Sequence, residues 1–300
     1  TQTCTLDAYS INKIQFINSQ TGYLLVGLPD GVLMKSTNGG ENWFFSDCFY
    51  GPSIKNDFVF INVNTGWLIN SAPNPYQNNN IVYKTTNGGV NWEFNNPGFN
   101  SPNLTSIHFI NSSTGWISAD SNIIFQSTDG GTNWVAINTN SDYRIIRTDF
   151  ADGQNGWAFG RKSSIYSDST AVLRTSNGGA IWSISQLPKN NLNGLCFYNN
   201  IGWTFQDYTI LKSTNSGLNW SYKSDTNGYN SINSVFFIDS SFGWAVSPVH
   251  HFLKTTDGGA RWENAPIDIN NTVFHEYVKV QFINRNTGWI LNGARVAKTT

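Results

Sequence analysis

The stretch that decides the fold runs from Gly115 to Trp134 and reads GWISADSNIIFQSTDGGTNW. It opens with a Gly-Trp pair at the start of an apolar run and closes with a turn rich in Asp, Gly and Asn. In that turn Asp129 is a short side-chain acceptor for backbone N–H groups, and Gly131 permits a positive φ without Cβ strain. Trp134 then re-enters a strand. The stretch therefore predicts a β-hairpin.

Both halves of this stretch recur along the chain. Glycine followed by an aromatic opens an apolar run at Gly22-Tyr23, Gly66-Trp67, Gly115-Trp116, Gly156-Trp157, Gly202-Trp203, Gly243-Trp244 and Gly288-Trp289. The turn pattern S/T-x-N/D-x-G-x-x-W occurs six times, with its third position at Asn38, Asn87, Asp129, Asn177, Asn215 and Asp257. The aromatics of the first pattern are spaced by 41 to 49 residues, the length of one propeller blade of four short strands.

We therefore predict an all-β fold, a seven-bladed β-propeller of four-stranded antiparallel blades that forms a single domain over residues 1–300. The last unit lacks a fourth strand, and we expect residues Thr3 to Tyr9 to supply it, so that the N-terminal strand closes the ring. The expected blades span residues 11–48, 56–95, 104–137, 144–186, 193–222, 232–264, and 277–300 plus 3–9.

Composition excludes several classes of protein. Aromatics make up 15% of the chain and charged residues only 12%, which excludes intrinsic disorder, and 41 asparagines disfavour long helices. A net charge of -1 argues against a nucleic-acid partner. No apolar stretch approaches the roughly 20 residues of a membrane span.

Three cysteines give neither a disulfide framework nor metal-ligand spacing. The sequence leaves undecided whether Cys4 and Cys48 form a disulfide. The apolar context of Cys196 predicts a buried thiol rather than a nucleophile. The chain begins at Thr1 without a signal peptide, which suggests a mature, processed form. With its Asn-rich, Lys-poor surface, this favours a secreted, cell-surface or periplasmic protein.

The turn motif resembles the Asp-box, or bacterial neuraminidase repeat, whose pattern is S/T-x-D-x-G-x-T-W. With the Gly-Trp strand before it, nearly the whole chain looks most like the propellers related to photosystem II stability and assembly factors. The resemblance implies the propeller fold. The resemblance does not select one function, because Asp-box propellers include sialidases, xyloglucan hydrolases, sortilin-type receptors and assembly factors. Asn replaces Asp in four of the six copies, which the turn chemistry tolerates.

Two enzyme classes are the alternatives to a binding function. The run Tyr143-Arg144-Ile145-Ile146 is faintly like the sialidase arginine motif, but it opens the fourth of seven units, where that motif does not belong. A glycoside hydrolase needs two carboxyl groups roughly 5 to 9.5 Å apart across a cleft. Nothing in the sequence pairs the loop carboxylates, so this class is the alternative, with candidates Asp120, Asp207 and Glu276.

Binding is the favoured function. The longest inserts, around Tyr76 and over Arg161 to Thr170, follow the Gly-Trp strand and should project from one face of the ring. Tyr and Arg are typical of contact surfaces. The adjacent pair His250 and His251 points to opposite faces of an extended segment, so we expect neither metal nor cofactor. The candidate partner-binding residues are Tyr76, Arg161, Tyr166, Asp207, Tyr208, His250 and His251.

We therefore predict a non-catalytic recognition or assembly module that binds a protein or glycan, as a possible subunit of a larger extracellular or periplasmic assembly. One further regularity has two interpretations. A base precedes the turn motif in six of seven units, at Lys35, Lys84, Arg174, Lys212, Lys254 and Lys298, with Gln126 in the remaining one. These side chains either form a ring of cations for an acidic partner or cover neighbouring aromatics with their alkyl stems.

Overall fold

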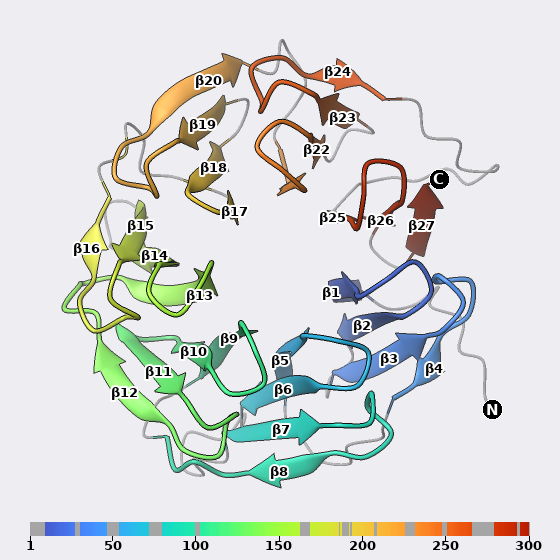
Figure 1. Ribbon diagram of the computed structural model, residues 1–300, viewed down its shortest axis with the longest axis vertical. Coiled ribbons are helices and arrows are strands. Elements are labelled where there is room, and N and C mark those ends of the chain that lie inside the picture. Colours follow the sequence, from blue (N-terminus) through green and yellow to red (C-terminus); the bar gives the residue numbers. More distant parts are fainter. Residues whose placement is uncertain are drawn as a thin grey trace.

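The seven repeats form seven antiparallel sheets arranged as blades around one axis (Figure 1). The computed structural model describes residues 10–27, 31–46, 54–71, 80–99, 103–162, 169–185, 187, 192, 194–206, 209–225, 232–247, 251–265, 279–292 and 295–299. Within these ranges six blades have four strands, the seventh has three, and no residue is helical. The predicted seven-bladed all-β propeller is confirmed.

Each blade runs outward from the axis in chain order, so that its first strand is innermost. The innermost strands are β1 (Ser10–Phe16), β5 (Ile54–Phe60), β9 (Leu104–Phe109), β13 (Arg144–Phe150), β17 (Gly194–Tyr198), β21 (Ser234–Phe237) and β25 (Lys279–Phe282). The second strands are β2 (Gly22–Gly27), β6 (Gly66–Ser71), β10 (Gly115–Ala119), β14 (Gly156–Lys162), β18 (Ile201–Gln206), β22 (Gly243–Val246) and β26 (Gly288–Asn292).

The third strands carry the residues that lead into the turn motif. They are β3 (Val32–Ser36), β7 (Ile81–Thr85), β11 (Ile123–Ser127), β15 (Ser169–Thr175), β19 (Thr209–Ser213), β23 (Phe252–Thr255) and β27 (Arg295–Thr299). The outer strands are β4 (Phe44–Phe45), β8 (Glu93–Asn95), β12 (Val135–Asn138), β16 (Ser183–Ile184), β20 (Ser221–Asp225) and β24 (Glu263–Asn264).

The Trp of each Gly-Trp pair joins its blade to the next one. Trp116 in the third blade stacks on Phe150 of the fourth, with ring centroids 3.6 Å apart and planes 4° apart, and its Nε1 donates to the Gly178 carbonyl at 3.2 Å. The burial of a large flat side chain against another ring contributes strongly to stability. Matching stacks join the other blades: Tyr23 on Phe60, Trp67 on Phe109, Trp157 on Phe197, Trp203 on Phe237, Trp244 on Phe282 and Trp289 on Phe16.

The turn motif is held by its own side chains. Ser127 Oγ accepts a hydrogen bond from the Gly131 amide at 2.8 Å and donates to Asp129 Oδ1 at 2.9 Å. That oxygen also accepts the Asn133 amide at 2.9 Å, and the Asn133 bonds lower the pKa of Asp129 to about 2. In the second blade Asn87 Oδ1 accepts the Asn91 amide at 2.9 Å. Asparagine serves as well as aspartate because one side-chain oxygen carries the turn.

The bases that precede the motif bind neighbouring blades. Lys35 Nζ donates to the Gly88 carbonyl of the second blade at 2.8 Å and lies 5.6 Å from the Tyr23 ring centroid. Lys212 repeats this with the Gly258 carbonyl at 3.0 Å and the Trp203 ring. The ammonium groups of these two lysines thus lie over aromatic rings and bind carbonyls of the next blade, where they stabilise contacts between blades.

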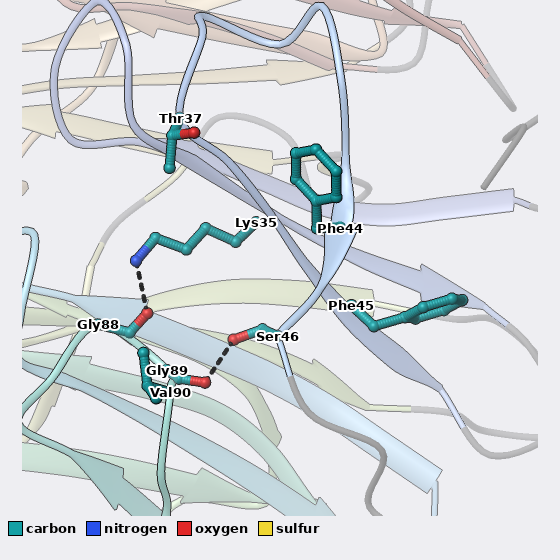
Figure 2. A pocket seen from close by; sticks show the side chains of 8 residues that line it. All are labelled: Lys35, Thr37, Phe44, Phe45, Ser46, Gly88, Gly89 and Val90. Carbon is teal, nitrogen blue, oxygen red and sulfur yellow. Dashed lines mark hydrogen bonds between the residues drawn. The ribbon is translucent and has the colours of Figure 1, made fainter. Parts of the chain in front are cut away.

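One pocket of about 310 Å³ lies at the seam between the first two blades (Figure 2). Lys35 reaches the Gly88 carbonyl across it, and Ser46 Oγ donates to the Gly89 carbonyl at 3.1 Å. Its polar groups thus join the two blades, and Thr37, Phe44, Phe45 and Val90 complete the lining.

The seventh blade meets the first directly. Trp289 stacks on Phe16 at 3.5 Å, and its Nε1 donates to the Gly39 carbonyl at 2.9 Å. Gln281 accepts the Phe16 amide at 2.8 Å and donates to the Phe16 carbonyl at 3.1 Å. These contacts close the ring. The expected closing strand Thr3 to Tyr9, and with it Cys4 and Cys48, lies outside the described residues.

Candidate functional site

The innermost strands carry a repeated four-residue run that ends in phenylalanine. The Phe packs between blades, and side chains alternate along a strand, so the first and third positions of each run lie on the opposite side from it. The runs are KIQF (13–16), DFVF (57–60), SIHF (106–109), RTDF (147–150), GLCF (194–197), SVFF (234–237) and KVQF (279–282). Polar residues at the first and third positions therefore gather near the axis.

Six titratable side chains at these positions form what we term the axial cluster. They influence one another electrostatically although they come from five blades. The axial cluster consists of Lys13, Asp57, His108, Arg147, Asp149 and Lys279.

Asp57 is fully engaged within this cluster. Its Oδ1 accepts Lys13 Nζ at 2.6 Å and the Phe58 amide at 2.9 Å, and its Oδ2 accepts the Ile107 amide at 3.0 Å. The carboxylate therefore joins three successive blades.

Asp149 is the second carboxylate of the axial cluster. Arg147 approaches it twice, with Nε 2.9 Å from Oδ2 and Nη2 3.2 Å from Oδ1. His108 Nδ1 lies 3.5 Å from Oδ1, and the Phe150 carbonyl lies 3.0 Å from His108 Nε2. Burial lowers the pKa of His108, so this imidazole is neutral at pH 7 and donates its Nε2 proton to the carbonyl.

Lys279 differs from the other two cations. Its Nζ donates to the backbone carbonyl of Asn12 in the first blade. Burial, followed by the nearby positive charges of Lys13 and Arg147, lowers its pKa to about 8. Among the described residues, Lys13 and Arg147 each have a carboxylate within 3 Å, whereas Lys279 has none within salt-bridge distance.

Cys196 occupies the third position of its run. Burial raises the pKa of its thiol to about 11. The thiolate is the reactive form, so we expect Cys196 to react with iodoacetamide on the order of a hundredfold more slowly at pH 8 than an ordinary thiol. Peptide mass spectrometry of alkylated, folded protein measures this rate. A rate at Cys196 equal to that of free cysteine would contradict the prediction.

The structure places three of the candidate catalytic and partner-binding residues. Asp120, at the end of β10, forms an ion pair with Arg144 at the start of β13 in the next blade. Arg161 is exposed on β14, directly opposite Arg144 in the strand register. His251 precedes β23, and its carbonyl accepts the Ser247 amide at 3.1 Å. Tyr76, Tyr166, Asp207, Tyr208, His250 and Glu276 lie outside the described residues.

Sequence reasoning did not identify the axial cluster. The available signal was the repeated run itself. When the seven runs are aligned on their final Phe, the first column reads Lys, Asp, Ser, Arg, Gly, Ser, Lys. Charged residues in a column at the centre of a propeller converge in space, because every innermost strand borders the axis.

Two searches of the described residues had negative results. No three His, Cys, Asp or Glu side chains in these ranges are placed to share a metal ion. The same part of the chain contains no helix with the length and apolar character needed to cross a membrane.

Comparison with known proteins agrees with this architecture. The family model described as photosynthesis system II assembly factor YCF48 matches residues 50–143. No curated protein sequence matches significantly.

Solved structures match over almost the whole chain. A structure described as YCF48 bound to D1 peptide is 18% identical, covers 99% of this chain and 95% of its own, and has a TM-score of 0.76. YCF48 from Cyanidioschyzon merolae is also 18% identical, covers 97% and 95%, and has a TM-score of 0.72.

A more distant match is the GH74 xyloglucanase from Xanthomonas campestris, at 9% identity and a TM-score of 0.64, covering 95% of this chain and 51% of that enzyme. At these identities the structural matches establish the fold. The repeat, the ring and the family match together confirm the resemblance drawn from the turn motif: the chain is a seven-bladed propeller similar to the YCF48 assembly-factor propellers.

Proposed function

We propose that this propeller is a non-catalytic module that binds a protein partner during assembly of a larger complex, outside the cytoplasm. The observation that carries the proposal is the pair of arginines at one end of the fourth blade. Arg144 and Arg161 lie directly opposite each other on β13 and β14, and both are exposed. Arg144 already holds Asp120, and two exposed guanidinium groups side by side offer further N–H donors, so a partner that supplies negative charge would be bound favourably there.

The same corner argues against the hydrolase alternative. A glycosidase uses its two carboxyl groups on substrate, whereas Asp120 is held by Arg144 in an ion pair between blades. The similarity to a structure of YCF48 with a bound peptide adds weight to a protein as the partner. A glycan partner remains the alternative outcome of the experiment below.

Arg161→Glu is expected to weaken partner binding at least tenfold, because it reverses an exposed charge at the proposed contact. The partner is first captured from an extract of the native organism and identified by mass spectrometry, and its affinity is then measured by titration calorimetry. Arg295→Glu, at the start of β27 in the seventh blade, is the matched control and should bind like the wild type.

Equal affinities for wild type, Arg161→Glu and Arg295→Glu would contradict the proposed contact. Cleavage of a polysaccharide from a test panel, lost in Asp120→Ala, would overturn the proposal in favour of the glycoside hydrolase.

A further inference from the structure

We propose that the axial cluster binds one carboxylate group of an acidic partner segment, with Lys279, Lys13 and Arg147 as the groups that receive it. This inference rests on the proposed function, because it takes the partner to be a protein. It identifies a second contact, at the axis, separate from the exposed arginines of the fourth blade.

The first argument is the charge balance of the axial cluster at pH 7. Lys13, Arg147 and Lys279 contribute three positive charges, Asp57 and Asp149 contribute two negative charges, and His108 is neutral. One positive charge is therefore left without a balancing carboxylate among the described residues of the cluster. One bound carboxylate would balance it.

The second argument is how the two internal carboxylates are used. Asp57 already accepts three hydrogen bonds, from Lys13 and from the Phe58 and Ile107 amides. Asp149 receives the Nε and Nη2 groups of Arg147. Neither can turn toward Lys279 without losing these partners, so a carboxylate that binds Lys279 directly would come from outside the cluster.

The third argument is access for a ligand. The side chain of Arg147 is 57% exposed and that of Lys13 is 31% exposed, although both lie on innermost strands. Because the runs align on their final Phe, Lys279 lies level with Lys13 and Arg147, and Arg147 follows Arg144 by three residues on β13. A partner bound at Arg144 and Arg161 would therefore approach the axial cluster along β13.

The donors also suit a carboxylate. The Arg147 guanidinium has five N–H groups, of which the Nε and Nη2 groups point at Asp149, and the remaining donors are available to a second acceptor. Two ammonium groups beside a guanidinium form a site for a carboxylate oxygen pair, with charge-assisted hydrogen bonds. A neutral amide ligand would leave the excess charge unbalanced.

A pH dependence follows from the same geometry. The charged groups that act on Lys279 from the blades around it are Lys13, Arg147 and Asp57. The pKa of Lys279 is about 8 without ligand, and an anion binds best to the protonated amine. Affinity for a carboxylate should therefore fall as the pH rises through 8.

The test uses a blocked triglutamate peptide as probe and the blocked triglutamine peptide as its neutral counterpart, with affinities measured by NMR titration of the full chain at pH 7. We expect the triglutamate to bind and the triglutamine not to bind. Lys279→Gln should weaken triglutamate binding about tenfold, the effect of one charge-assisted contact. Lys279→Arg should retain it within about threefold at pH 7 and should remove the decline above pH 8.

Lys223→Gln is the matched control, because it removes the same charge from exposed β20 on the outer rim. An equal loss of affinity in Lys223→Gln would show a general charge effect and overturn the inference, as would equal binding by wild type and Lys279→Gln. Should Lys279→Gln fail to fold, Lys279→Arg and the pH dependence of the wild type still decide.

The two proposals fail in distinguishable ways. If the native partner is captured through Arg161 but triglutamate does not bind near Lys279, the inference is wrong and the proposed function stands. If no protein partner is captured and a polysaccharide is cleaved, the proposed function is wrong, and the inference falls with it.

Discussion

Trp116→Ala is expected to lower the free energy of unfolding by about 3–5 kcal/mol. The indole is completely buried, stacks on Phe150 of the next blade and donates to the Gly178 carbonyl. Its removal leaves a cavity at a blade interface, one face of the Phe150 ring without contacts and a buried carbonyl without its donor. Urea unfolding followed by circular dichroism measures the loss as a shift of the midpoint.

Trp134→Ala is the matched control for this prediction. Trp134 belongs to the turn motif, is only partly buried, meets Phe109 edge-on at 5.9 Å and donates to the Gly131 carbonyl of its own turn. We expect a loss of about 1–2 kcal/mol, because less area is uncovered and a single hydrogen bond is lost. Equal losses in the two variants would show that the stacks between blades do not dominate stability.

Gly115→Ala is expected to cost about 3 kcal/mol or more of unfolding free energy, although it adds a single methyl group. A Cβ at this position would lie 2.5 Å from the Phe109 ring. That ring cannot move aside, because Trp67 stacks on its face at 3.7 Å and Trp134 lies against it at 5.9 Å. Thermal unfolding followed by calorimetry provides the measurement.

Gly153→Ala is the control that tests whether the stability loss of Gly115→Ala comes from the crowded Phe109 side chain. Gly153 lies in the turn after β13, and a Cβ there would have no atom within 4 Å. We expect its stability to stay within about 0.5 kcal/mol of the wild type. A comparable loss in Gly153→Ala would contradict the assignment of the Gly115 effect to the crowded aromatic ring.

The sequence predicts the ring because the same contacts are made at every blade interface. Gly115, Trp116 and the turn around Asp129 each have counterparts one blade away, and their repetition at a period near 45 residues leaves few architectures open. The sequence also predicted that Asn87 and Asp129 have the same role at equivalent positions of two turns, since each supplies one side-chain oxygen to a following amide.

The axial cluster was harder to predict because its members are neighbours only after the ring closes. Lys279 and Lys13 are separated by almost the whole chain, and their electrostatic coupling depends on the seventh blade lying beside the first. The pairing of Asp120 with Arg144 has the same origin, since these residues belong to different blades. Sequence reasoning treated Asp120 as a candidate catalytic acid because an exposed loop carboxylate looks alike whether or not an arginine from the next blade holds it.

The contact between Phe16 and Trp289 also has a consequence for synthesis of the chain. The first blade emerges from the ribosome early, but the partner ring that covers Phe16 lies in the last blade to be made. Until then the nascent chain presents an aromatic surface at each end of an open arc, and such surfaces are where aggregation and attachment to other chains begin. Binding of chaperones should therefore be greatest just before residues 281–299 are released. A chain truncated within β26 should remain an open, aggregation-prone arc of blades and should not close into a smaller ring.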